Sequence, residues 1–419
     1  MDERVDARAS ATPWLELAPF RALRYNPGAV PDLGAVTCPP YDVINAHGVE
    51  TFEAADPHNI VRLILPRPID DTDKYERAAA DLRAWRAAGV FERDDEPGLY
   101  VYELTHGDHV TAGLVGAVSV HDVADRRVLP HEDVFAGAVV DRTSLMLATQ
   151  AQLEPILLTY DGDGAASDVV DDTLQTAPLL EVATADGALH RLWRITDPGV
   201  LATVQADLAE RQALIADGHH RYAAYRALRD HPAAPDGAGH GLAMLVDARR
   251  HPLRLGAIHR SVGDLGWDDA LAAARGGFAE VSPASLDDFG GGAPGWPRLV
   301  LSDGERHVVL SEPDAALVAA SMPSQASDEW RRLAASLLCE FVLAKLLGVP
   351  DTDPRVAYHH SRDDAIRRAQ ETGGVALLLP SAALSDVLTL AARGERMPRK
   401  STSFGPKPRT GLLIRLLDE

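Results

Sequence analysis

The sequence predicts a mixed α/β protein with two domains, on the strength of three observations. The chain has 419 residues, more than the roughly 250 to 300 at which a single hydrophobic core stops growing. Apolar residues make up 46% of it and charged residues 25%, which is typical of folded globular proteins rather than disordered ones. Short apolar runs typical of strands are interspersed with helical patterns along the whole chain, which favours an α/β or α+β fold.

The first hundred residues combine one strand-like run with one helix. Residues 59–65 (NIVRLIL) are β-branched and apolar, so we expect a strand there. Residues 72–88 carry apolar side chains at helical spacing and end at a glycine, which predicts a surface helix. Residues 99–104 and 111–120 flank a polar turn at 106–108, which predicts an antiparallel hairpin.

The middle of the chain contains several apolar runs of strand length and two helical stripes. One stripe is formed by Val200, Val204 and Leu208, which are spaced four residues apart. Strands are expected at residues 156–160, 189–195, 214–216 and 242–246, and helices at residues 142–153, 200–208 and 222–229.

The strongest loop signal of the chain lies at residues 287–297 (DDFGGGAPGWP). The composition shifts toward apolar helices beyond it, so we place a domain boundary shortly before it. The expected organisation is a tail at residues 1–18, an N-terminal region at 19–262 and a C-terminal α/β domain at 263–419.

The C-terminal domain is expected to begin with a hairpin. Residues 298–301 and 307–310 flank Asp303-Gly304, a pair typical of a type I′ turn. Leu333, Leu337 and Phe341 then predict a long helix. The remaining expected elements are a strand at 375–379, a helix at 382–392 and a closing strand at 411–417.

The charge balance limits the classes of partner. The net charge of −21 argues against nucleic acid or an anionic membrane surface as the main partner. Neither a membrane-spanning apolar run nor the pattern of a signal peptide occurs in the sequence, so we expect a cytoplasmic protein. Cys38 and Cys339 match no zinc or redox spacing, and we expect reduced thiols.

The segment ALIADGHHRYAAYRAL (213–228) is the most informative part of the sequence. A strand that ends at Asp217-Gly218 and opens directly into a helix offers unpaired backbone N–H groups and the positive end of a helix dipole to an anion. His219, His220 and Arg221 add side-chain donors to the first helical turn. The simpler alternative is that Asp217 caps the helix and both histidines are solvated. Two histidines followed by an arginine exceed what a cap requires, which favours a phosphate site.

Two further segments have the same kind of chemistry. Pro130-His131-Glu132 holds a carboxylate on a stiff loop, where it suits proton abstraction from a hydroxyl, although Glu132 is equally a common first-turn residue of a helix. Residues 397–407 (MPRKSTSFGPK) gather hydroxyls and ammonium groups that suit anionic oxygens, or else form an exposed basic loop. Residues 38–43 (CPPYDV) fit a pocket wall and ordinary packing equally well, and the prediction of the site leaves them out.

Taken in order, the motifs PHE (130–132), ADGHHRYAA (216–224) and PRKSTSFGP (398–406) resemble those of the ParB/sulfiredoxin-like free serine kinases. The full length, with PFRAL (19–23) and CPPYDVI (38–44), resembles a related bacterial family filed as a domain of unknown function. The resemblance implies a ParB/sulfiredoxin-like nucleotide-binding core at about 114–262, an N-terminal extension before it and a C-terminal domain that closes the cleft.

The resemblance also implies a role for each site residue. Glu132 would be the catalytic carboxylate that receives the substrate hydroxyl proton, and Asp217 would be a second essential acid near the substrate or Mg²⁺. His131 and Arg142 would contact the substrate. The implied contacts to the nucleotide phosphates are Gly218, His219, His220, Arg221, Lys400, Ser401 and Thr402.

The sequence thus predicts a magnesium-dependent kinase that uses ATP or ADP and phosphorylates a small hydroxylated metabolite, with free L-serine as the expected acceptor. Phosphoryl transfer needs positioning and charge stabilisation more than covalent chemistry, and the three motifs supply groups for both. One alternative is a ParB-like switch that binds and hydrolyses a nucleotide without an acceptor. Another is a sulfiredoxin-like activation of an oxidised thiol, which would need a cysteine where His219 stands.

Overall fold

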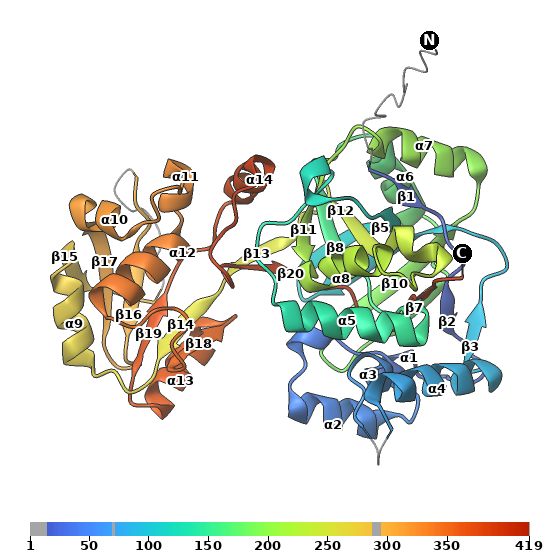
Figure 1. Cartoon of the computed structure of the whole chain (residues 1–419), viewed down its shortest axis with the longest axis horizontal. Coiled ribbons are helices and arrows are strands. Elements are labelled where there is room, and N and C mark those ends of the chain that lie inside the picture. Colours follow the sequence, from blue (N-terminus) through green and yellow to red (C-terminus); the bar gives the residue numbers. More distant parts are fainter. Residues whose placement is uncertain (1–14, 69–71, 287–294, 419) are drawn as a thin grey trace, which may run out of the picture. The chain divides into compact units, whose positions relative to one another are not determined.

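The computed structural model describes residues 15–68, 72–286 and 295–418 (Figure 1). Most of the expected tail and most of the expected loop at 287–297 lie outside these residues. Within them the chain forms helices and several sheets, so the predicted mixed α/β class is confirmed. No helix in these three ranges is both long enough and apolar enough to cross a bilayer.

The chain divides into two compact units, and their composition differs from the expected split after residue 262. The first unit comprises residues 1–129, 134–253 and 406–419, and the second comprises residues 130–133 and 254–405. The last fourteen residues therefore belong to the first unit. Backbone pairing explains this, since Thr410 pairs with Cys38 and Ile414 with Leu23.

The first unit is built on a mixed sheet whose central strands are buried on both faces. β6 and β11 are parallel, as are β8 and β12, and the other neighbours on the path run antiparallel. In spatial order the strands are β6 (Val128–Leu129), β11 (Ala213–Asp217), β8 (Ile156–Tyr160), β12 (His240–Asp247), β5 (His109–Ser119), β4 (Leu99–His106), β10 (Ala188–Ile195) and β9 (Leu180–Ala183), and β1 (Leu17–Ala18) pairs with β5.

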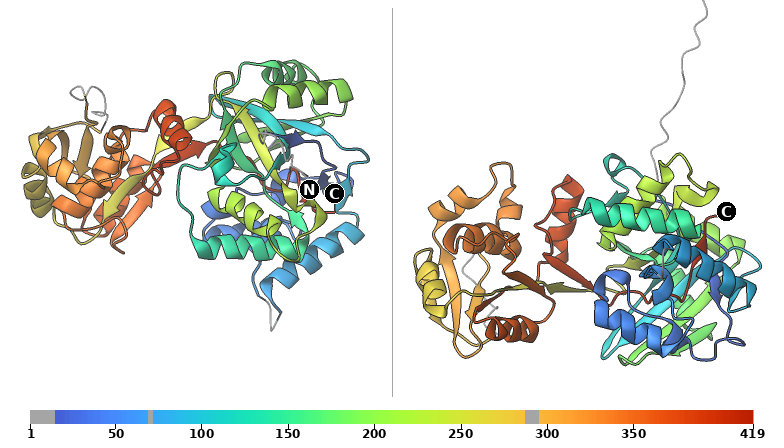
Figure 2. Two further views of the ribbon diagram at one scale, coloured as in Figure 1. Left: turned by 45° about the horizontal axis from the view of Figure 1, so that its top comes forward. Right: turned by 60° about the horizontal axis from the view of Figure 1, so that its bottom comes forward.

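Two helix pairs cover this sheet. Helices α5 (Ala136–Thr149) and α8 (His219–Arg229) pack together on one side, and α6 (Ala165–Leu174) and α7 (Pro198–Leu208) pack together on the other (Figures 1 and 2). The predicted hairpin, the strands at 156–160, 189–195, 214–216 and 242–246, and the helices α7 and α8 are confirmed. Helix α5 starts six residues before the predicted helix and ends at Gln150, whose φ is positive.

The N-terminal segment forms a second hydrophobic cluster beside α5. The predicted strand at residues 59–65 is wrong, because Val61–Ile64 form the short helix α3. Asn59 Oδ1 accepts a hydrogen bond from the Val61 backbone N–H at 2.9 Å, which starts a helical turn. The run is largely buried, and such short apolar runs do not distinguish a strand from a helix. The other elements here are β2 (Leu23–Tyr25), α1 (Leu33–Val36), α2 (Ala46–Ala55), the predicted α4 (Lys74–Ala87) and β3 (Phe91–Arg93).

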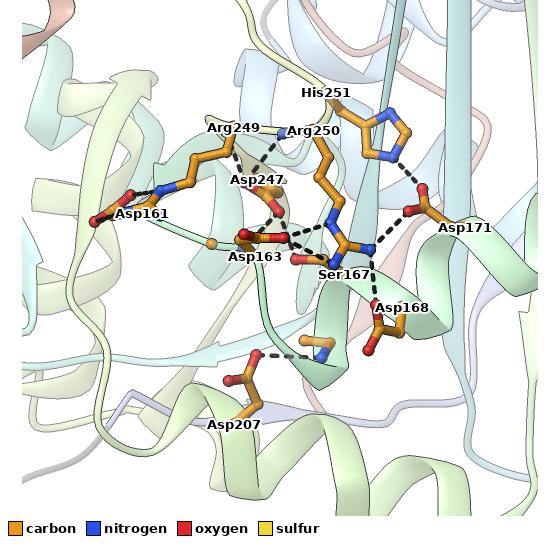
Figure 3. Close-up of polar contacts among 12 residues, drawn as sticks. Asp161, Asp163, Ser167, Asp168, Asp171, Asp207, Asp247, Arg249, Arg250 and His251 are labelled. Atoms are coloured by element: carbon orange, nitrogen blue, oxygen red, sulfur yellow. Dashed lines mark hydrogen bonds and ion pairs between the residues drawn. The ribbon is translucent and has the colours of Figure 1, made fainter.

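An ion network fixes the turn after β8 to the end of β12 (Figure 3). The Asp247 carboxylate accepts hydrogen bonds from the Asp163 N–H and the Ser167 hydroxyl at 2.9 and 2.5 Å. Arg250 donates to Asp163 and also to two aspartates of α6. Since these charges pair with one another, the network is a structural clamp.

The second unit contains an antiparallel sheet and a separate two-stranded ribbon. The sheet order is β15 (Phe278–Pro283), β17 (His307–Pro313), β16 (Leu299–Ser302), β19 (Val375–Leu378), β14 (His259–Val262) and β18 (Val356–His359), and β13 (Arg254–Ala257) pairs with β20 (Thr402–Gly405). Its helices are α9 (Trp267–Arg275), α10 (Ala315–Ser321), α11 (Asp328–Arg331), α12 (Ala334–Ser336), α13 (Arg362–Glu371) and α14 (Leu384–Arg393).

Three predictions for the C-terminal part need correction. The predicted hairpin forms, but its turn is not type I′, since Gly304 has a positive φ and Asp303 does not. Asp303 instead uses its carboxylate to bind the N–H groups of Glu305 and Arg306. The predicted long helix is broken into α11, α12 and the π-helix η4 (Leu337–Leu346). The predicted closing strand shrinks to β21 (Arg415–Leu416), which pairs with β7 (Ala151–Gln152).

Candidate functional site

The turn between β11 and α8 has the geometry that its sequence predicts. Gly218 adopts a φ of +94° between the strand and the helix. A methyl group in place of its hydrogen would lie 2.8 Å from Ile156 Cγ2 and 3.2 Å from Arg221 Nε. Only glycine therefore fits this turn without strain or displacement.

The N-terminus of α8 has no side-chain cap, so the alternative that Asp217 caps the helix is wrong. The Asp217 carboxylate binds two cations instead. Its Oδ2 accepts a hydrogen bond from Arg221 Nη2 at 2.6 Å, and its Oδ1 accepts one from Lys407 Nζ. Among the described residues, no side-chain cap thus closes the positive end of this eleven-residue helix.

Arg221 lies beneath this turn rather than on its surface. It is 4% exposed and donates to the Pro155 carbonyl as well as to Asp217. Burial alone would lower the pKa of Arg221, but the negative charges of Glu154 and Asp217 raise it. Its Nε is buried and has no hydrogen-bond partner among the described residues. Arg221 is therefore a permanent cation that fixes Asp217 and keeps one donor unused at the glycine turn.

Glu154 is the second buried anion of this cluster. It is 5% exposed, and burial raises its pKa, although Arg221 and Arg142 act in the opposite direction. Its Oε1 accepts hydrogen bonds from the Tyr41 N–H at 2.9 Å and from the Thr410 hydroxyl. Nothing in the local sequence around Glu154 marked it as a site residue.

Tyr41 brings the segment at residues 38–43 to this cluster, although the prediction of the site left it out. The Arg142 guanidinium lies 4.3 Å from the centre of its ring and the Arg221 guanidinium 5.9 Å. Arg142 is buried, donates to the Ile64 carbonyl and lines a small cavity of about 30 Å³ with Glu154 and Arg221. Such a volume is about that of one water molecule.

The two histidines of the motif lie half-buried in the first turn of α8. His220 Nε2 accepts a hydrogen bond from the Phe135 N–H at 3.0 Å. The rings of His220 and Phe135 are stacked at 5.7 Å with an angle of 6° between their planes. Since Phe135 is 51% exposed, this pair places an aromatic face beside the helix N-terminus.

The second unit holds the other predicted residues together. Glu132 Oε1 accepts hydrogen bonds from the Ser401 N–H at 3.3 Å and the Thr402 hydroxyl at 3.1 Å. The side chain of Glu132 is 16% exposed. Burial raises its pKa, and the hydrogen bonds from Thr402 and Ser401 offset part of this effect. A carboxylate with a raised pKa is a better proton acceptor than an ordinary surface glutamate.

The loop around Ser401 is positioned by specific contacts. His131 Nε2 shares a hydrogen bond of 2.8 Å with the Thr402 hydroxyl, and its ring meets Phe404 edge-on. Lys400 is exposed at a φ of +53°. Ser401 is 3% exposed, and its hydroxyl has no hydrogen-bond partner in the part of the chain that the structure describes.

The predicted site residues thus form two sets. Asp217, Gly218, Arg221 and the two histidines share one turn of the first unit, and Arg142 joins them through Tyr41. His131, Glu132, Lys400, Ser401 and Thr402 form one loop cluster in the second unit. Sequence reasoning missed Lys407, Glu154 and Tyr41. Lys407 ends the segment at residues 397–407, whose ammonium groups were predicted to suit anionic oxygens, but the prediction gave Lys407 itself no role.

The described residues do not fit a protein-held magnesium ion. They contain no group of three carboxylate, imidazole or thiol side chains arranged to hold a metal. Arg221 and Lys407 occupy both oxygens of Asp217, the acid that the family resemblance assigned to a role near magnesium. Both cysteines are free, as predicted, and both are buried.

A family model described as "Protein of unknown function (DUF1015)" matches residues 17–333. The chain belongs to this family. The predicted resemblance to a family filed as a domain of unknown function is therefore confirmed, although the loop at residues 398–406 lies beyond the matched part of this DUF1015 protein. No curated protein matches the chain.

Several solved structures are similar to this DUF1015 protein. A C-terminally truncated SbnI from Staphylococcus aureus is 12% identical, with 72% of this chain and 87% of that chain covered and a TM-score of 0.37. A free serine kinase mutant in complex with AMP is 13% identical, with 68% and 89% covered and a TM-score of 0.35. A second mutant of a free serine kinase, in complex with ADP, is 12% identical, with 73% and 94% covered and the same TM-score of 0.35.

Proposed function

We propose that this protein is a small-molecule kinase that transfers a phosphoryl group from ATP or ADP to the hydroxyl of a free amino acid, with L-serine as the acceptor. The observation that carries the proposal is the turn at Gly218. There an uncapped helix N-terminus meets a buried arginine with an unused donor. Such a turn is suited to phosphate oxygens.

The proposed reaction exchanges one P–O bond for another and moves one proton. The hydroxyl oxygen of the acceptor attacks the terminal phosphorus of the nucleotide, and the bridging oxygen leaves with the shortened nucleotide. The hydroxyl proton passes to Glu132. Because Oε1 of Glu132 already accepts hydrogen bonds from Ser401 and Thr402, Oε2 is the oxygen that takes this proton.

The phosphate contacts are assigned to the backbone N–H groups that follow Gly218 and to the side chains of His219 and His220. Arg221 supports them from below, since its guanidinium holds Asp217 in place. Lys400 and Ser401 are proposed as further phosphate contacts, and Ser401 brings a buried hydroxyl that no described residue binds. His131 orients Thr402, which in turn holds Glu132. The assay contains Mg²⁺ as the usual partner of a nucleotide.

Phosphorus NMR tests the reaction directly. The protein is incubated with Mg²⁺, ATP or ADP, and a panel of hydroxyl compounds that includes L-serine, and a new phosphomonoester signal is expected. Loss of nucleotide at the same rate with and without acceptor would contradict the kinase proposal and indicate a nucleotide-hydrolysing switch.

Glu132→Gln tests the assignment of the base. This variant should lose at least about a hundredfold in transfer rate, because general-base catalysis typically contributes about 10² to 10⁴. Its nucleotide affinity, measured by calorimetry, should stay unchanged. The matched control is Glu305→Gln, which removes an exposed carboxylate elsewhere in the second unit. Near-normal turnover of Glu132→Gln would remove this residue as the base.

A further inference from the structure

The second unit contains a cavity of about 370 Å³ whose walls carry opposite charges. This volume lies in the range of small-molecule sites, roughly 300 to 1,000 Å³. One wall comes from η4 and the turn after it and carries Glu340 and Asp351. The other comes from the loop before Lys400 and carries Arg396 and Arg399, and Asp133 lies beside it with its Oδ1 3.9 Å from Arg396 Nε.

The acidic wall has one carboxylate that lacks a cation. Asp351 is satisfied, because its Oδ1 accepts a hydrogen bond from Arg260 Nε at 2.8 Å and its Oδ2 accepts one from the Tyr358 hydroxyl. Glu340 has no hydrogen-bond or ion-pair partner among the described residues. Burial and the negative charge of Asp351 raise the pKa of Glu340. A positively charged ligand group would relieve this repulsion.

The basic wall is held in place by contacts to the backbone. Arg396 Nη1 donates to the Pro130 carbonyl, and the carbonyl of Arg396 accepts a hydrogen bond from Trp330 Nε1 at 2.7 Å. The carbonyl of Arg399 accepts one from Arg260 Nη2 at 3.2 Å. Since Arg260 also binds Asp351, one buried guanidinium fixes both walls.

The basic wall also continues into the loop that holds the proposed base. The Met397 N–H donates to the His131 carbonyl at 2.8 Å, and the Ser401 N–H donates to Glu132. Met397 and Asp133, the immediate neighbour of Glu132, both line the cavity. The cavity therefore adjoins Glu132 within the same unit.

We infer that this cavity binds the acceptor, and that the acceptor is a zwitterion whose ammonium group lies against Glu340 and whose carboxylate lies against Arg396 and Arg399. The assignment of the ligand as the acceptor rests on the proposed function, whereas the charge pattern of the cavity does not depend on it. The volume equals that of roughly twelve water molecules. It thus accommodates compounds larger than a three-carbon amino acid, such as a dipeptide.

Titration calorimetry without nucleotide tests the charge pattern. The probes are L-serine, L-homoserine and the dipeptide glycyl-L-serine, each compared with its N-acetyl and carboxamide derivatives. At least one zwitterion should bind, and removal of either charge should weaken its binding at least tenfold. If none of the three zwitterions binds, or if the derivatives bind within threefold of their parents, the inference is overturned.

Glu340→Gln links the binding to the cavity. This variant should bind the zwitterion at least tenfold more weakly, whereas Glu305→Gln should bind it as the wild type does. Its melting temperature should equal or exceed that of the wild type, because an unpaired half-buried charge has been removed. Unchanged affinity would remove Glu340 from the site. Binding of a zwitterion without any phosphoryl transfer would contradict the kinase proposal but support the zwitterion site. Transfer without this charge dependence would support the kinase proposal but contradict the zwitterion site.

Discussion

Gly218→Ala tests the geometry of the glycine turn most directly. The left-handed backbone costs a residue with a Cβ about 1–2 kcal/mol. The new methyl group would also lie 2.8 Å from Ile156 Cγ2 and 3.1 Å from Ile156 Cβ. Overpacking of this kind costs about 1–3 kcal/mol. The two effects together predict a loss of about 2–5 kcal/mol in the free energy of unfolding of the first unit.

The measurement is urea unfolding followed by tryptophan fluorescence, in which the buried Trp85 and Trp193 report on the first unit. The matched control is Gly187→Ala. Gly187 lies in the same unit at a φ of +80°, but an added methyl group would meet nothing within 4 Å. The control should therefore lose only the backbone part, about 1–2 kcal/mol. The difference between the two variants measures the clash with Ile156.

Equal losses in the two variants would refute this reasoning, because the close approach of Ile156 would then have no energetic effect. The same variant also bears on function. Relief of the clash requires the start of α8 to move away from β8, and the N–H groups after Gly218 move with it. We expect Gly218→Ala to weaken nucleotide binding and Gly187→Ala to leave it unchanged, as measured by calorimetry.

Two further predictions concern buried and half-buried charges of the first unit. Arg221→Met should destabilise the unit by about 3–5 kcal/mol in urea unfolding. Asp217 would lose a hydrogen-bond donor, and Glu154 would lose the cation that most offsets the cost of burying its charge. Adding Glu154→Gln should recover part of that loss, and no recovery would argue against the coupling. Burial alone would raise the pKa of Asp141, but hydrogen bonds from Lys74 and its other partners lower it to about 2 from 3.8. Because the folded-state pKa is depressed, this carboxylate stabilises the fold above about pH 4, and the stabilisation disappears between about pH 4 and 2. Asp141→Asn should cost on the order of 1 kcal/mol at neutral pH and nothing near pH 2, so a constant difference across that range would contradict the assignment.

The parts of the fold that the sequence predicts well have strong local signals. The hairpin of β4 and β5 follows from two strand-like runs that flank a polar turn, and the junction of β11 and α8 follows from a glycine between a short apolar run and a helical segment. Helix α3 was missed because its apolar run is too short to show a period. The π-helix η4 was missed because its apolar residues fit an ordinary helix equally well.

The parts of the site that the sequence did not predict depend on contacts across long separations. Lys407 and Asp217 are 190 residues apart, and Tyr41 and Glu154 are 113 residues apart. Neither pair leaves a spacing signal, because each forms only when segments that are distant in sequence assemble. Arg221 lies in a motif that the sequence does reveal. Its burial beneath the turn is nevertheless not predictable, because it depends on the packing of Pro155 and Ile156.

The arrangement around Asp217 has a consequence for the approach of an anion to this turn. Its two cations differ in access, since the side chain of Arg221 is 4% exposed and that of Lys407 is 21% exposed. Arg221 is held by Pro155 as well as by Asp217, whereas Lys407 is on a flexible stem and lines a cavity of about 210 Å³ with Arg409 and His190. Lys407 therefore faces this cavity, whereas Arg221 does not line it. Because Arg221 also binds Asp217, a turn of Lys407 from the carboxylate to an anion would leave Asp217 with one of its two cations.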